Sequence, residues 1–112
     1  MSDRWNIIFA QGATYEQTIT MDGVSDIATA TLWRLSFAMS NDAPFLTATT
    51  ANGYLVPTGS ANERKILIPA SITDAMPLGN GRFDFEIEWA GPIVRRYVSN
   101  GYCQVNPPAG TT

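Results

Sequence analysis

The sequence predicts an all-β fold, an antiparallel β-sandwich of about 7–9 strands with one short helical turn near residues 71–76. Three observations support this prediction. Apolar and polar residues alternate with a period of two in several segments, turn-forming residues recur about every 10 residues, and only one segment carries a helix-start signal. The length of 112 residues suits a single domain, which we expect over residues 1–106, followed by a Pro-rich tail over 107–112.

Three segments show the alternation most clearly. Residues 83–89 place aromatic and aliphatic side chains on one face and acidic ones on the other. Residues 33–39 alternate with Arg34, Ser36 and Ala38, and residues 15–21 alternate with Glu16 and threonines. We expect the apolar faces to form the core. Its predicted large members are Trp33, Leu35, Phe37, Met39, Phe83, Phe85, Ile87 and Trp89.

Weaker strand patterns cover residues 5–10, 45–49, 54–56 and 64–68. Residues 93–105 should form two strands or one bent strand, because Ser99-Asn100-Gly101 interrupts the apolar pattern.

Glycine, asparagine and proline mark the connections. Asn52-Gly53 predicts a tight hairpin, since both residues tolerate a positive φ. Gly79-Asn80-Gly81 predicts a turn, and its position before a strand excludes a phosphate-binding loop. Ser71 is a candidate helix N-cap with an acidic residue three positions on, and Pro77 should end that helical turn.

Composition argues against several classes of function. The net charge of -3 without a basic stripe disfavours nucleic-acid binding, and no apolar run or leader pattern predicts a membrane span or a signal peptide. The chain has no histidine, so the commonest general base and zinc ligand are missing. The single Cys103 cannot form an internal disulfide and is expected to be a small buried hydrophobe in a protein made in the cytosol. We therefore expect no enzyme, no cofactor and no metal.

Asp84, Glu86 and Glu88 form an acidic stripe on one predicted strand face. Their spacing of roughly 6.5–7 Å overlaps that of glycosidase carboxylates, and such a stripe could also bind Ca²⁺. The favoured interpretation is a solvated face neutralised by arginines of neighbouring strands, with Glu88 close to Arg95 if the chain turns at residues 90–93. The candidate arginines are Arg34, Arg64, Arg95 and Arg96. Asp22-Gly23 and Asp26 lack the spacing of a calcium loop and are interpreted as turn residues.

Five residues are candidates for binding a partner. Trp5, Tyr54 and Tyr102 lie outside the strongest core pattern, and Pro107 and Pro108 in the tail are poor ladder residues that could lie on another protein. The same aromatic residues could instead stack on sugars, which leaves a carbohydrate-binding module as an alternative.

Several segments, taken in order, resemble a known family. They are Phe9–Tyr15, a strand that ends near Met21–Gly23, then Thr31–Phe37, Leu46–Gly53, Lys65–Ile68, Ile72–Gly79, Gly81–Trp89 and Val94–Pro107. This order, over roughly residues 5–107, is similar to the small immunoglobulin-like β-sandwich structural proteins of tailed bacteriophages. That group includes the N-terminal domain of upper baseplate proteins that attach receptor-binding fibres.

The resemblance implies a non-enzymatic virion protein of the tail, baseplate or fibre-attachment region, without catalytic residues. Its implied partners are other virion proteins and copies of itself, with no nucleic acid and no membrane. The same fold as a capsid decoration (cement) protein of the phage head is the alternative. Exposed sheet edges with few lysines to guard them favour assembly by edge pairing or tail exchange.

Overall fold

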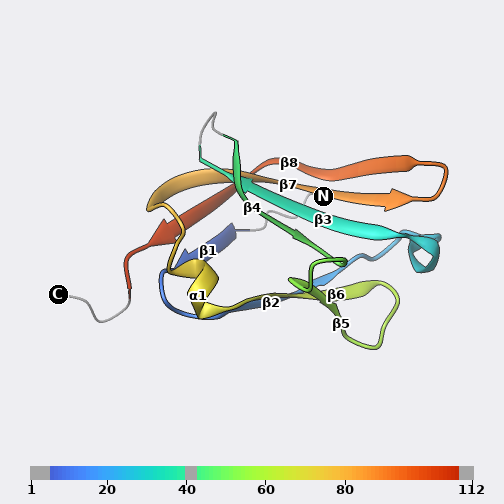
Figure 1. Ribbon diagram of the computed structural model, residues 1–112. Helices are drawn as coiled ribbons and strands as arrows, with labels where there is room; N and C mark the ends of the chain where they lie inside the picture. The colour runs from blue at the N-terminus through green and yellow to red at the C-terminus, as the bar shows by residue number, and fades with distance from the viewer. Residues whose placement is uncertain (1–5, 40–42, 109–112) are drawn as a thin grey trace.

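The computed structural model describes residues 6–39 and 43–108, which form two β-sheets packed face to face (Figure 1). One sheet has five strands in the order β1-β8-β7-β3-β4, and the other has three in the order β2-β6-β5. The strands are β1 (Asn6–Ala10), β2 (Tyr15–Thr20), β3 (Leu32–Ala38), β4 (Pro44–Thr49), β5 (Leu55–Pro57), β6 (Glu63–Ile68), β7 (Gly79–Trp89) and β8 (Ile93–Asn106).

The strand order is that of an immunoglobulin-like sandwich. In such folds strands B, E and D form one sheet, and strands C, F and G, extended by C′, form the other. Here β2, β6 and β5 correspond to strands B, E and D. In the other sheet, β4, β3, β7 and β8 correspond to strands C′, C, F and G. The predicted all-β sandwich is therefore confirmed, with eight strands in the described residues. One pairing differs from the antiparallel prediction: β1 runs parallel to β8, because the chain crosses to the other sheet after β1 instead of turning back in a hairpin.

The predicted apolar faces of β3 and β7 are buried. Trp33 of β3 is 1% exposed and lies beside Phe85 of β7, with ring centroids 5.9 Å apart. Facing residues of both sheets complete the core. They are Ile7, Phe9, Ile19, Leu35, Phe37, Ala48, Leu55, Ile66, Ile68, Phe83, Ile87, Trp89, Cys103 and Val105.

The predicted hairpin at Asn52-Gly53 is wrong, because β4 and β5 belong to different sheets. The segment instead carries the chain from one sheet to the other. The Asn52 side chain holds this crossing: its Oδ1 accepts from the backbone N–H groups of Thr49 (3.0 Å) and Tyr54 (3.2 Å), and its Nδ2 donates to the carbonyl of Thr47 (2.8 Å). Of the two predicted turn residues, Gly53 has a positive φ of 88°, whereas Asn52 does not adopt one. Local turn chemistry does not determine which sheet the chain enters next.

The predicted turn at residues 79–81 is also wrong. All three residues lie in β7, where Gly79 pairs with Val105 and Gly81 with Cys103. A Cβ on Gly81 would lie 2.4 Å from the carbonyl oxygen of Ala38, so glycine here permits close packing of neighbouring strands.

The helical turn predicted near residues 71–76 exists, but the helix begins one residue earlier and ends at Thr73, before Pro77. The helix α1 (Ala70–Thr73) follows Pro69, which occupies the N-cap place without a side-chain cap, so Ser71 is not the cap. A second short helix, the 3-10 turn η1 (Ile27–Thr29) between β2 and β3, was not predicted.

Strand β8 is the single bent strand that the sequence allowed. Its pairing with β7 shifts between Phe83 and Glu86, opposite residues 96–101, and Asn100 adopts a φ of 57°. The Asp84 side chain accepts a hydrogen bond from the backbone N–H of Asn100 at 2.9 Å, which stabilises the bend. The strand ends at Asn106, directly before the exposed Pro107 and Pro108.

Candidate protein-interaction surface

The outer face of the five-stranded sheet carries the acidic stripe, and arginines neutralise it. Glu86 lies between Arg34 of β3 and Arg96 of β8, with nitrogen–oxygen distances of 2.9 Å and 2.6 Å. Arg34 also approaches Glu88 at 3.8 Å, and Arg82 lies 3.9 Å from Asp84. The structure thus confirms the favoured interpretation of the stripe as cross-strand charge complementarity.

These contacts fix the charge of Glu86. The hydrogen bonds from Arg96 and, to a lesser extent, Arg34 hold the pKa of this carboxyl below its usual value. Glu86 is therefore ionised at neutral pH and unsuited to act as a general acid.

Two arginines take partners other than the predicted acidic stripe. Arg95 pairs in register with Ile87, so its side chain points to the inner side of the sheet and not toward Glu88. The predicted proximity of Glu88 and Arg95 is wrong, because adjacent residues of a strand face opposite sides. Arg64 lies over the Trp33 ring at 5.0 Å.

Arg95 contacts the connection between β2 and β3. Its guanidinium forms two contacts of 3.3 Å with the carboxylate of Asp26 and lies 4.5 Å from the ring centroid of Trp89. The indole Nε1 of Trp89 donates to the carbonyl of Asp26 at 2.8 Å. Asp26 is therefore held twice: its carboxylate contacts Arg95, and its backbone carbonyl accepts the hydrogen bond from Trp89.

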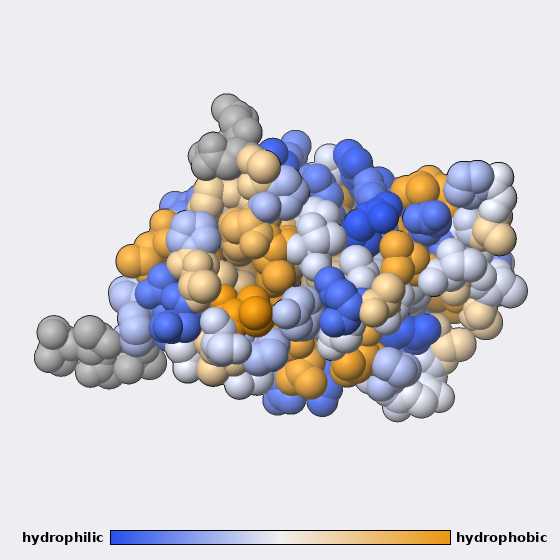
Figure 2. Space-filling view, in the orientation of Figure 1, coloured by the Kyte–Doolittle hydropathy of each residue, from blue (hydrophilic) through white to orange (hydrophobic). Residues whose placement is uncertain are grey.

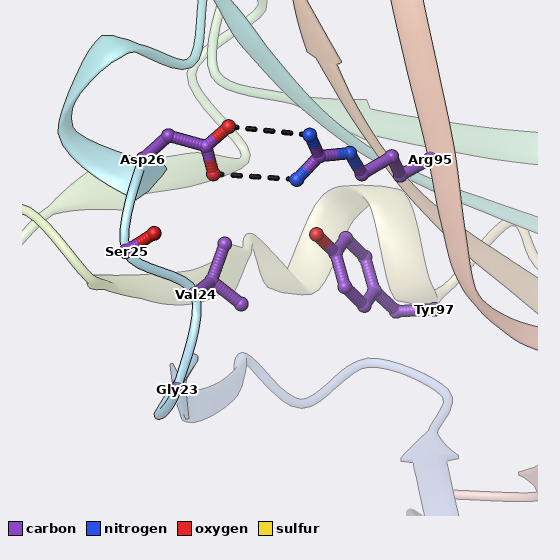
Figure 3. Close-up of a pocket in the computed structure, with 6 residues that line it drawn as sticks. All are labelled: Gly23, Val24, Ser25, Asp26, Arg95 and Tyr97. Carbon is purple, nitrogen blue, oxygen red and sulfur yellow. Dashed lines mark hydrogen bonds and ion pairs between the residues drawn. The ribbon is translucent and has the colours of Figure 1, made fainter.

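A hollow of about 400 Å³ opens beside this ion pair (Figure 3). The β2–β3 connection supplies one wall, and alternate residues at the start of β8 supply the other. Val24 and Tyr97 face each other across it, beside the paired Asp26 and Arg95. Its lining residues are Gly23, Val24, Ser25, Asp26, Arg95 and Tyr97.

The predicted partner-binding residues do not gather at one place. Tyr102 of β8 is 44% exposed, and its hydroxyl lies 3.0 Å from Asn80 Oδ1 and 2.9 Å from Gln104 Oε1. Tyr54 is half-buried against the core just before β5, in the other sheet. Pro107 and Pro108 are exposed after β8, whereas Trp5 lies outside the described residues.

Sequence reasoning missed three exposed apolar side chains that lie on β8, the strand of Tyr102, or on its neighbour β1. Ile8 of β1 is 48% exposed, and Ile93 and Val94 of β8 are 51% and 48% exposed. We call Ile8, Ile93, Val94 and Tyr102 the β1–β8 edge. Two adjacent apolar residues at positions 93 and 94 break the alternation, and that break is the signal that could have revealed them. On the face in view, hydrophobic residues gather in the left half and are interspersed with polar residues in the right half (Figure 2).

Cys103 of β8 carries the single thiol of the chain. Cys103 is buried, and burial raises the pKa of its thiol to about 11. Residues 6–39 and 43–108 contain no cluster of three carboxylate or cysteine side chains placed to bind a metal ion. Within the same ranges, none of the helices has the length and apolar character of a membrane span.

Neither a protein-family model nor a curated protein sequence matches the chain significantly. One solved structure similar to it is the first immunoglobulin domain of the mouse polymeric immunoglobulin receptor. The two share 11% sequence identity with a TM-score of 0.47, over 96% of this chain and 95% of that chain. This similarity concerns the fold and carries no inference about binding.

Proposed function

We propose that the protein is a non-enzymatic structural component of a tailed-bacteriophage virion, in the tail, baseplate or fibre-attachment region, and that it acts through protein–protein contacts. The observation that carries the contact role is the β1–β8 edge. Four of the large exposed apolar side chains, Ile8, Ile93, Val94 and Tyr102, lie on two neighbouring strands at one edge of a sheet.

Physical chemistry favours burial of this edge against another protein. Full burial of an exposed aliphatic side chain is worth about 1.5–3 kcal/mol, and Ile8, Ile93 and Val94 are about half exposed, so covering each one gains about half of that. On the outer face, which Val94 shares with Glu86, the charges of Glu86 and its arginines already compensate each other, so a partner can cover that face without leaving a lone charge; Ile93, opposite Trp89, lies on the inner side of the edge. Exposed backbone edges add hydrogen-bonding groups that a second protein can satisfy.

A paired substitution tests the contact role. The double variant Ile8→Thr/Ile93→Thr should reduce incorporation of the protein into particles at least tenfold, measured by quantitative mass spectrometry of purified virions. The matched control is Val56→Thr, which removes an outward-facing aliphatic group from β5 in the other sheet and should incorporate normally. Equal incorporation of both folded variants would contradict a role for the β1–β8 edge.

The virion assignment rests on the sequence resemblance, and electron microscopy of labelled particles tests it. Density at the tail or baseplate is the expected result. Density distributed over the head lattice would instead identify the alternative, a capsid decoration protein. Purified particles that lack the protein altogether would contradict both.

One observation favours carbohydrate binding as a second candidate function. The exposed ring of Tyr102 is flanked by the amide side chains of Asn80 and Gln104, and sugars are bound by aromatic rings beside polar groups. Glycan-array binding that is lost on Tyr102→Ala but kept on Tyr54→Ala would support this function. Absence of binding to every glycan would dismiss it.

A further inference from the structure

Part of strand β8 has an open edge. Strand β1 pairs with β8 only over Tyr102–Asn106, and no described strand pairs with the outer edge over residues 93–98. This stretch spans about 20 Å at 3.3–3.4 Å per residue, enough for one added strand. The unpaired part is also the part that carries the exposed Ile93 and Val94.

The ladder shows which backbone groups face outward there. The carbonyl of Glu88 accepts a hydrogen bond of 2.8 Å from the N–H of Thr31, so the polar groups of Glu88 point toward β3. Glu88 lies opposite Val94, which therefore directs its own N–H and C=O away from β7. Arg96 lies two residues after Val94 and opposite Glu86, so its backbone N–H and C=O also point away from β7. Val94 and Arg96 thus present the donors and acceptors of a strand-addition site.

The hollow described above lies on the inner side of the same edge. Arg95 and Tyr97 are alternate residues of β8, and both line it (Figure 3). In an added strand, a side chain opposite Arg95 would lie about 4.5–5.5 Å away at Cβ and would point into the hollow. The guanidinium of Arg95 has five N–H donors; two of them contact the carboxylate of Asp26, and Arg95 also shares a side-chain hydrogen bond with Tyr97.

The charges argue against a second copy of this chain as the added strand. A two-fold antiparallel pairing centred on this stretch places Arg95 or Arg96 directly opposite the same residue of the other copy. Like charges directly opposite destabilise a sheet, whereas a carboxylate there would be attracted.

We propose that residues 93–98 bind an extended segment of a different protein by strand addition, and that this segment inserts an acidic side chain into the hollow beside Arg95. The proposal rests on the proposed protein–protein role and specifies the chemistry of one partner.

A library of synthetic nine-residue peptides without proline is the probe. Selection on the wild-type protein should enrich peptides with alternating β-branched residues and one central Asp or Glu. On binding a selected peptide, hydrogen exchange at the amides of Val94 and Arg96 should slow at least tenfold. No enrichment, enrichment without an acidic residue, or unchanged exchange at these two amides would overturn the proposal.

Two matched pairs of variants test the geometry. Val94→Pro removes an outward N–H that β7 does not use and should abolish peptide binding, whereas Val94→Thr keeps the N–H and should bind normally. Val24→Asp places a carboxylate in the hollow and should weaken binding at least tenfold relative to the nearly isosteric Val24→Asn. Equal binding within either folded pair would overturn the proposal. If Val94→Pro does not fold, the proposal is tested by comparing Val24→Asp with Val24→Asn and by the amide exchange of the wild-type protein.

Two further results separate this proposal from the proposed function. Dimers of the free protein with slowed exchange at Val94 and Arg96 would show that a second copy occupies the edge, which also overturns it. Normal incorporation of Val94→Pro and Val24→Asp into virions, with no peptide enrichment, would refute strand addition while leaving the virion role intact.

Discussion

Trp33 shows how one residue can join several parts of the molecule. Its ring is 1% exposed, lies beside Phe85 of the neighbouring strand and is covered by the guanidinium of Arg64 from the other sheet. The indole Nε1 is buried, and no hydrogen-bond partner for it is found among residues 6–39 and 43–108. The large apolar area of the ring therefore outweighs the cost of one uncompensated donor.

Truncation of the central aromatic residues should be costly. We expect Trp33→Ala and Phe85→Ala each to lower the free energy of unfolding by about 3–5 kcal/mol, because each leaves a cavity in a packed core. Urea denaturation measures the change. Leu78→Ala, at a side chain that is 56% exposed, is the control and should change stability by less than about 0.5 kcal/mol. A near-neutral result at either aromatic position would refute its role in the core.

The pH dependence of stability should report on Glu86. Its folded pKa is lowered, so its contribution is fully present above the ordinary glutamate value of 4.5 and is lost as the pH falls through the folded pKa. Glu86→Gln removes this contribution. The stability difference between wild type and Glu86→Gln should therefore be constant near neutral pH and shrink below pH 4.5, as measured by urea melts at each pH. A difference that stays constant down to pH 2 would contradict the ion-pair interpretation.

At the scale of elements, strand β8 has three different environments along its length. Its first part has an open edge, its middle part bends at Asn100, and its last part lies between β1 and β7. The bend occurs where Gly101 packs against the ring of Phe83. One strand can therefore close the core at one end and remain available to a partner at the other.

The bend depends on glycine at one position only. A Cβ on Gly101 would lie 2.5 Å from the Phe83 ring, so Gly101→Ala should destabilise the protein by about 1–3 kcal/mol. Asn100 has the positive φ of 57°, and Asn100→Gly should be tolerated because glycine adopts this conformation freely. Thermal unfolding of the two variants distinguishes them. Equal melting temperatures would show that the close approach at Gly101 does not constrain the bend.

At the scale of the whole molecule, the two sheets close over one core. Strand β8 ends at Asn106, and the carbonyl of Asn106 accepts a hydrogen bond of 3.0 Å from the N–H of Gln11. The sandwich therefore ends at Asn106, and Pro107 and Pro108 are exposed directly after it.

Removal of residues 107–112 should leave the domain folded and weaken assembly. Because Asn106 pairs with Ala10, the truncation has to end after Asn106 and not before it. We expect the truncated protein to keep the melting temperature of the full chain within about 2 °C, since no core residue is lost. Its incorporation into particles should fall severalfold. Full incorporation would contradict a role of the tail in assembly.

The residues of the candidate interaction surface were only partly predictable. Tyr102 was identified because it is an aromatic residue out of phase with the core, and it is indeed exposed. Tyr54 met the same criterion but is half-buried, since the crossing held by Asn52 places it against the core. The hollow could not be foreseen, because Asp26 and Arg95 are 69 residues apart and meet only in the folded chain.

The sequence by itself determined the class of fold and the inward faces of β3 and β7, because side chains that alternate with a period of two must bury one face of a strand. Only the tertiary structure decided which strands become neighbours. In the tertiary structure, Asn52-Gly53 lies in a crossing between the two sheets and not in the expected hairpin. Residues Gly79–Gly81 belong to strand β7, and residues 93–98 lie at an open edge. The reason is physical: alternation reports which side of a strand meets water, whereas strand order depends on contacts between residues far apart in the chain.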